Sequence, residues 1–161
     1  MLFKGCLAGL FHFTGVLKFF SENVISMNNF PHEFIHIYQD WVYGGIAKYY
    51  KQPGHTNIEF EAYFLVDLFK TLYGAGGGLL AIQDPSPPFA DYIDYLGDLR
   101  DMWLNNNLNY QSLMNHTSPK GRGYNDFLEY FRDYDPRGGY PLHPSLDNPI
   151  PLYDFTDFSG C

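Results

Sequence analysis

Two histidines four positions apart put the strongest constraint on how this chain folds. His32 and His36 belong to the segment His32-Glu33-Phe34-Ile35-His36, which reads H-E-x-x-H. Residues four apart lie one above the other on one helix face, so both imidazoles can reach a single metal ion if the segment is helical. Glu33 follows the first histidine, where its carboxylate can accept a proton from a water on that ion. The segment therefore predicts a helix with a zinc site and Glu33 as the catalytic base.

The sequence around this motif predicts a mostly helical α+β fold. Pro31 suits a first helical turn, and Pro53-Gly54 stops the helix, which we expect to run from 31 to about 50. A second helix is expected from 58 to about 73, capped by Thr56 or Asn57. The two helices form the predicted metal-site pair, residues 31–73. Alternating aromatic and β-branched residues before Pro31 predict a small β element within residues 1–30.

The rest of the chain is expected to complete a single domain, residues 1–161. Residues 74–134 are expected to form a helical remainder, in which apolar residues recur at helical spacing in 89–104 and 124–134, with a short helix over 110–115. From 135 to 161 proline and glycine are frequent, which predicts an extended tail lying over the domain.

A catalytic zinc needs a third protein ligand and one position open to water. Glu59 is the nearest candidate and lies near the start of the second helix. A turn at Pro53-Gly54 would let that helix pack against the first, which would bring Glu59 to the histidines. Glu61 is the alternative ligand if the register differs. The ordinary explanation is that Glu33 and Glu59 are first-turn acids favoured by the helix dipole.

This arrangement resembles the gluzincin branch of the zincin metallopeptidases, in which a glutamate on a following helix is the third ligand. The segment Glu59-Phe60-Glu61-Ala62 is similar to the Glu-x-x-Ala-Asp ligand segment of several metallopeptidase families, including those that process prenylated proteins. The resemblance covers residues from about 15 to 70 and carries Glu59 over as ligand. Tyr63 stands where the family has an aspartate that hydrogen-bonds a ligand histidine. The Tyr63 hydroxyl, or Asp67 further along the helix, is the expected substitute.

The resemblance implies a zinc-dependent hydrolase of peptide bonds, with one Zn²⁺ per chain and a peptide or protein as substrate. Gln39 follows His36 by three positions on nearly the same helix face, so we expect it to support that ligand. Four residues are candidate hydrogen-bond donors to the oxyanion: Tyr38, Tyr43, His55 and His116.

The alternative is a catalytically inactive zincin-like module that binds a ligand or has a structural role. Zincins usually carry a twisted sheet before the active-site helix, and its edge aligns the peptide substrate. Only one or two strands fit before Pro31, which indicates a reduced or partial member and favours the inactive module. Glu33 favours the hydrolase, because a binding module has no need of that base.

Composition excludes some partners. The net charge of −8 argues against nucleic acid and against an anionic membrane surface. No run of eighteen apolar residues occurs, so no membrane span is expected.

The N-terminal segment lacks the features of a clear signal peptide, so we expect a soluble protein that is cytoplasmic, or secreted if the natural N-terminus lies upstream. Cys6 and Cys161 could form one disulfide or remain free thiols. Aromatic residues make up 19% of the chain, which predicts a core built from rings or, alternatively, an exposed aromatic ligand surface.

Overall fold

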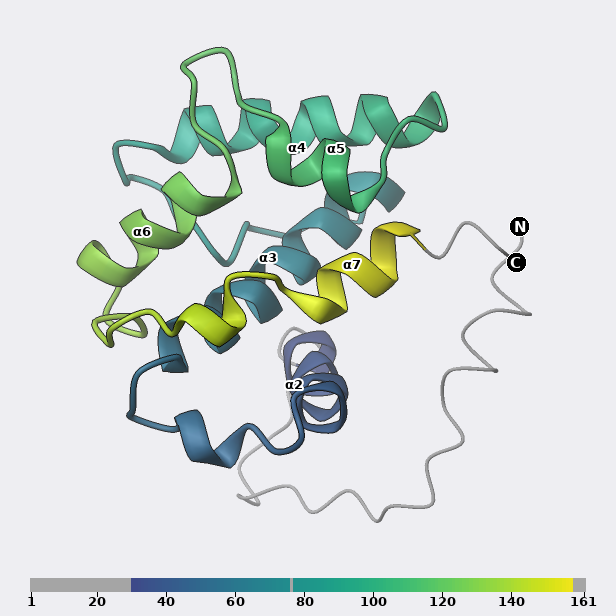
Figure 1. Ribbon diagram of the computed structural model, residues 1–161. Coiled ribbons are helices and arrows are strands. Elements are labelled where there is room, and N and C mark those ends of the chain that lie inside the picture. The colour runs from purple at the N-terminus through teal and green to yellow at the C-terminus, as the bar shows by residue number, and fades with distance from the viewer. Residues whose placement is uncertain (1–29, 76, 158–161) are drawn as a thin grey trace.

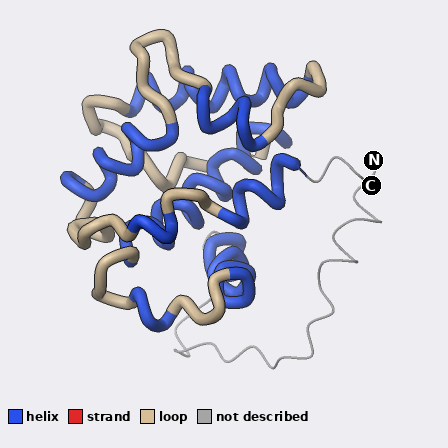
Figure 2. Tube along the Cα trace, viewed as in Figure 1, coloured by secondary structure: helices blue, strands red, loops and turns tan. Residues whose placement is uncertain are grey.

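The computed structural model describes residues 30–75 and 77–157, and the regular elements within these ranges are all helical (Figures 1 and 2). The helices are α2 Phe30–Val42, α3 His55–Tyr73, α4 Phe89–Leu104, α5 Tyr110–Asn115, α6 Tyr124–Tyr134 and α7 Ile150–Asp157, with 3₁₀ helices at Ala47–Tyr49 and Pro144–Leu146. The predicted mostly helical fold is confirmed. The expected β element, residues 1–30, lies almost entirely outside the described residues, as do Cys6 and Cys161.

Helix α3 lies at the centre of the molecule and packs against α2, α4, α6 and α7 (Figure 1). Its side chains are buried along most of its length, including Phe60, Phe64 and Leu68. A helix that is apolar on several faces needs partners on several sides. None of the helices in the part of the chain that is described has the length and apolarity to cross a bilayer.

Aromatic rings fill the space between α3, α4 and α6. Phe60 and Phe64 both contact the ring of Tyr124, and Phe64 also lies near Tyr95. Two of the buried tyrosines pair their hydroxyls: Tyr92 donates to Asp67, and Tyr95 donates to the carbonyl of Leu113. Burial of each such ring contributes roughly 2–3 kcal/mol to folding. The predicted ring-built core is confirmed.

Two predicted helix bounds were wrong, both in the metal-site pair. Helix α2 ends at Val42 and not near residue 50, because Gly44 and Gly45 take positive φ values of 64° and 97° and turn the chain. Helix α3 begins at His55, three residues before the expected start. The expected cap Thr56 instead exchanges hydrogen bonds with the backbone of Tyr140. By contrast, α4, α5 and α6 have the predicted bounds.

The prediction of an extended tail over residues 135–161 was also wrong in part. Residues 150–157 form α7, which packs on α2, α3 and α5. Pro151 lies in the first turn of this helix, where a missing N–H costs no hydrogen bond. Leu152 is fully buried, so burial of one apolar face stabilises a segment whose proline content indicated a loop.

Candidate metal centre

Three side chains from α2 and α3 converge on one point. Nε2 of His32 lies 2.8 Å from Nε2 of His36. The carboxylate of Glu59 lies 3.5 Å from the first of these nitrogens and 3.3 Å from the second. In a tetrahedral zinc site with bonds of about 2.0–2.1 Å, neighbouring ligand atoms lie about 3.3 Å apart. Each nitrogen–oxygen distance is close to this value, with Oε2 of Glu59 facing His32 and Oε1 facing His36, whereas the nitrogen–nitrogen distance is shorter.

The packing of α2 on α3 creates this convergence. His32 and His36 lie one turn apart on α2, and Glu59 lies in the second turn of α3. Ile35, between the histidines in sequence, is buried in the core and anchors the helix. His32 is only 6% exposed, whereas Glu33 is exposed. The three candidate ligands can therefore hold a cation from the protein side, while Glu33 stays accessible to water and substrate.

The charges of Glu59 and His32 suit a cation, whereas a proton on His36 competes with it. Burial acts to raise the pKa of Glu59, but hydrogen bonds and charge from the two histidines lower it below its ordinary value. Burial lowers the pKa of His32, which favours the neutral imidazole that a metal needs. Burial acts in the same direction on His36, where the contacts with Glu59 and Gln39 outweigh it and raise the pKa. One anionic carboxylate thus faces two imidazoles.

Gln39 sets the tautomer of His36. Its Oε1 lies 2.7 Å from Nδ1 of His36. The amide nitrogen of Gln39 donates to the carbonyl of Ile58 and to the carboxylate of Glu61, so the amide oxygen must face the histidine. That oxygen only accepts hydrogen bonds, so Nδ1 carries the proton and Nε2 presents its lone pair to the metal position. The expected support of His36 by Gln39 agrees with this geometry.

Glu61, the alternative ligand, lies outside the three-residue group. It is 2% exposed, and burial raises its pKa to about 7. Its carboxylate accepts hydrogen bonds from Gln39, from the hydroxyl of Tyr43 and from the backbone N–H of Leu152. The structure therefore brings Glu59 to the imidazoles and uses Glu61 to orient Gln39.

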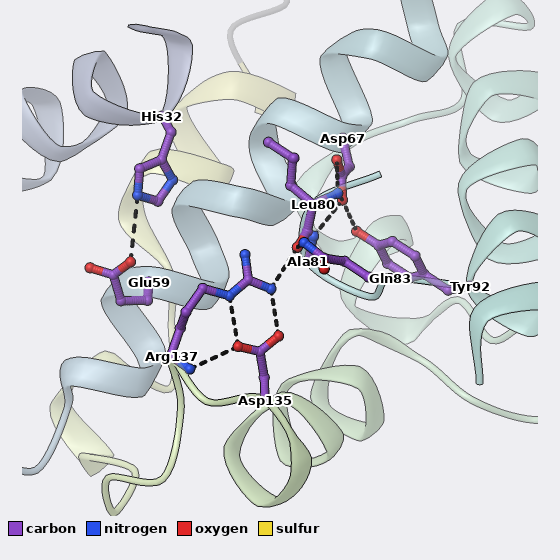
Figure 3. A network of polar contacts seen from close by, with 9 residues as sticks. All are labelled: His32, Glu59, Asp67, Leu80, Ala81, Gln83, Tyr92, Asp135 and Arg137. Carbon is purple, nitrogen blue, oxygen red and sulfur yellow. Dashed lines mark hydrogen bonds and ion pairs between the residues drawn. The ribbon is translucent and has the colours of Figure 1, made fainter. Parts of the chain in front are cut away.

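The two expected substitutes for the family aspartate lie in different places. The Tyr63 ring stacks on the His32 ring, with centroids 3.9 Å apart and planes 21° apart. Asp67 accepts hydrogen bonds from the N–H groups of Leu80 and Ala81 and from the hydroxyl of Tyr92 (Figure 3). Tyr63 contacts a candidate ligand through its ring, whereas Asp67 holds the loop after α3.

The four candidate oxyanion donors are dispersed. The Tyr38 hydroxyl donates to Asp154 on α7, and His116 pairs with Asp98 at 3.1 Å. The Tyr43 hydroxyl donates to Glu61. His55 precedes Glu59 by one turn on α3, and burial lowers its pKa while the charges of Glu59 and His36 also act on it. Among the four, His55 is the candidate that shares a helix face with Glu59, four positions away on α3.

Arg137, which the sequence patterns did not indicate, also belongs to this region. Its guanidinium carbon lies 4.2 Å from the centroid of the Tyr63 ring. Arg137 follows α6 in an irregular segment, far from Tyr63 in sequence. Neither helical periodicity nor motif spacing relates two such positions, so no local signal could have identified it.

No family of known proteins, no curated protein and no solved structure matches this chain. The geometry of the candidate metal centre and the H-E-x-x-H segment are therefore the features of this chain that bear on its function.

Proposed function

We propose that this protein is a zinc-dependent hydrolase of peptide bonds, with His32, His36 and Glu59 as ligands of one Zn²⁺. The observation that supports this most is the convergence of the three side chains from two helices. Two neutral nitrogens and one carboxylate are a donor set typical of catalytic zinc, which keeps a fourth position for water. Glu59 and Gln39 both contact the ring nitrogens of His36, so the donor set is held in place in the metal-free protein.

The residues around the ion have distinct tasks in this proposal. Zinc supplies an activated water and polarises the scissile carbonyl when it is bound. Glu33 accepts the proton of the water and transfers it to the leaving amine. His55 donates a hydrogen bond to the oxyanion that forms on the carbonyl. The exposure of Glu33 suits this task, because a base must reach both water and substrate.

A second candidate is a metal-binding module without hydrolysis. It is supported by the absence of strands from residues 30–75 and 77–157, since a peptide substrate is commonly aligned by a sheet edge. In this case the metal would stabilise the packing of α2 on α3, and Glu33 would be an ordinary surface residue.

Metal analysis and one isosteric variant test both candidates. Purified protein should hold about one equivalent of zinc, which chelators or His36→Ala remove. Glu33→Gln should keep the zinc and lose hydrolysis of a mixed peptide library, whereas Glu129→Gln, at an exposed position on α6, should keep both. Bound zinc without hydrolysis in the wild type would support the module. Protein that takes up no zinc would contradict both candidates.

A further inference from the structure

His32 lacks the hydrogen bond that usually orients a metal-binding histidine. A metal-binding histidine generally donates its second ring N–H to a carboxylate, a carbonyl or a water, which fixes the ring. In this structure Nδ1 of His32 is buried and has no hydrogen-bond partner among the described residues. Another contact must therefore determine where its Nε2 points.

That contact is the face of Tyr63. The two rings are nearly parallel, and Tyr63 follows Glu59 by four positions on α3. Residues with this spacing lie on one helix face. The carboxylate of Glu59 therefore meets the edge of the His32 ring near Nε2, while the Tyr63 ring covers its face. Together they limit both the tilt and the rotation of the imidazole.

Arg137 in turn holds Tyr63. Its guanidinium lies over the Tyr63 ring, a favourable arrangement for a cation and a π system. Nε of Arg137 donates to Asp135 at 2.6 Å, and Nη2 donates to the carbonyl of Leu80 at 2.8 Å (Figure 3). The guanidinium is thus held by partners from two segments of the chain. Asp135 follows α6, and Leu80 lies between α3 and α4. Its side chain is 28% exposed, so water screens the contact only in part.

We propose that Arg137 is a positioning residue for the metal-binding His32 and acts through the ring of Tyr63. The proposal rests on the metal site of the proposed function, but the contact that it describes exists in the metal-free protein. It makes the segment after α6 a determinant of zinc affinity. It also explains how His32 can be oriented although tyrosine replaces the aspartate of the ligand segment that this sequence resembles.

Nuclear magnetic resonance of the metal-free protein tests the positioning directly. Protons above an aromatic face resonate upfield, so the ring protons of His32, assigned with His32→Gln, should be shifted upfield in the wild type. Arg137→Met and Tyr63→Leu should move them towards the unfolded-chain position. Tyr63→Phe, which keeps the ring, should leave them upfield. Arg132→Met is the matched control, because Arg132 forms a similar pair with Asp133 on α6.

Zinc titration provides the second measurement. Arg137→Met should raise the dissociation constant about tenfold, as loss of an outer-shell partner typically does, whereas Arg132→Met should not change it. Arg137→Lys keeps the charge but not the planar fork and should give an intermediate value, which covers the case in which Arg137→Met does not fold.

The outcomes separate the two proposals. The control Arg132→Met should change neither the His32 resonances nor the zinc affinity. If Arg137→Met and Arg137→Lys also change neither, the positioning role is wrong. If the wild type takes up no zinc, the proposed function is wrong, and the His32 resonances alone then support or overturn the contact through Tyr63.

Discussion

Gln39 accepts a hydrogen bond from Nδ1 of His36 across 2.7 Å, and this contact directs the other ring nitrogen towards Glu59. The amide of Gln39 cannot turn over, because its nitrogen is bound to the buried carboxylate of Glu61. Glu61 also binds the N–H of Leu152 at the start of α7. The C-terminal helix, the buried carboxylate and the candidate metal ligand are therefore joined in one chain of hydrogen bonds.

Gln39→Leu should weaken zinc binding while the fold persists. The variant removes the acceptor that fixes the His36 tautomer, and outer-shell losses of this kind cost about 10–100-fold in metal affinity. It should also lower the free energy of unfolding by about 1–3 kcal/mol, because Glu61 loses a buried donor. Zinc titration and urea unfolding measure the two effects. Gln52→Leu, at an exposed position, is the control. Equal zinc affinities in the two variants would show that Gln39 does not fix the tautomer of His36.

Glu59→Gln and Glu61→Gln should differ sharply in zinc binding, although the positions are two residues apart. Glu59→Gln removes the anionic candidate ligand and should weaken zinc binding by more than the roughly 100-fold that the loss of an outer-shell partner can cause. Glu61→Gln keeps the three candidate ligands and should retain one equivalent of zinc with a smaller loss. Calorimetric titration of both variants makes the comparison, and the reverse order would assign the third ligand to Glu61.

The candidate site was predictable from sequence to the extent that it depends on local spacing. The four-residue interval between His32 and His36 fixes a shared helix face, and the turn at Gly54 allows Glu59 to return to it. Periodicity also predicted α4 and α6, in each of which one apolar face recurs regularly. These features are encoded within one or two helical turns, so a single sequence contains them.

Contacts between distant segments were not predictable in the same way. The bond between Gln39 and Glu61 depends on how two helices cross, and the contact of Arg137 with Tyr63 depends on an irregular segment. Helix α7 was missed because Pro151 indicates a loop locally, while the burial of Leu152 that favours a helix exists only in the folded protein. Tertiary packing overrides local preference at such positions.

Gly54→Ala should destabilise the protein more than Gly74→Ala does. Both glycines cap α3 with positive φ, at 98° and 63°, so both variants carry the strain of a left-handed alanine, about 1–2 kcal/mol. A Cβ at Gly54 would also lie 2.8 Å from the ring of Tyr49 and 3.1 Å from His143, whereas at Gly74 it would meet nothing within 4 Å. Urea unfolding of the two variants should therefore show a larger loss for Gly54→Ala, and equal losses would mean that Tyr49 moves aside freely.

Asp67 should make stability depend on pH in a defined direction. Burial raises its pKa from 3.8 to about 6, although the N–H groups of Leu80 and Ala81, Lys70 and the Tyr92 hydroxyl act to lower it. The folded protein thus binds this proton more tightly than the unfolded chain does. The resulting stabilisation is fully present below about pH 4 and is lost as the pH rises through about 6.

The two pKa values of Asp67, folded and unfolded, differ by about 2, which corresponds to about 3 kcal/mol. The free energy of unfolding of the wild type, relative to that of Asp67→Asn, should therefore be larger at pH 4.5 than at pH 7.5 in urea titrations. An equal difference at the two pH values would show that the carboxyl titrates alike in the folded and unfolded chains.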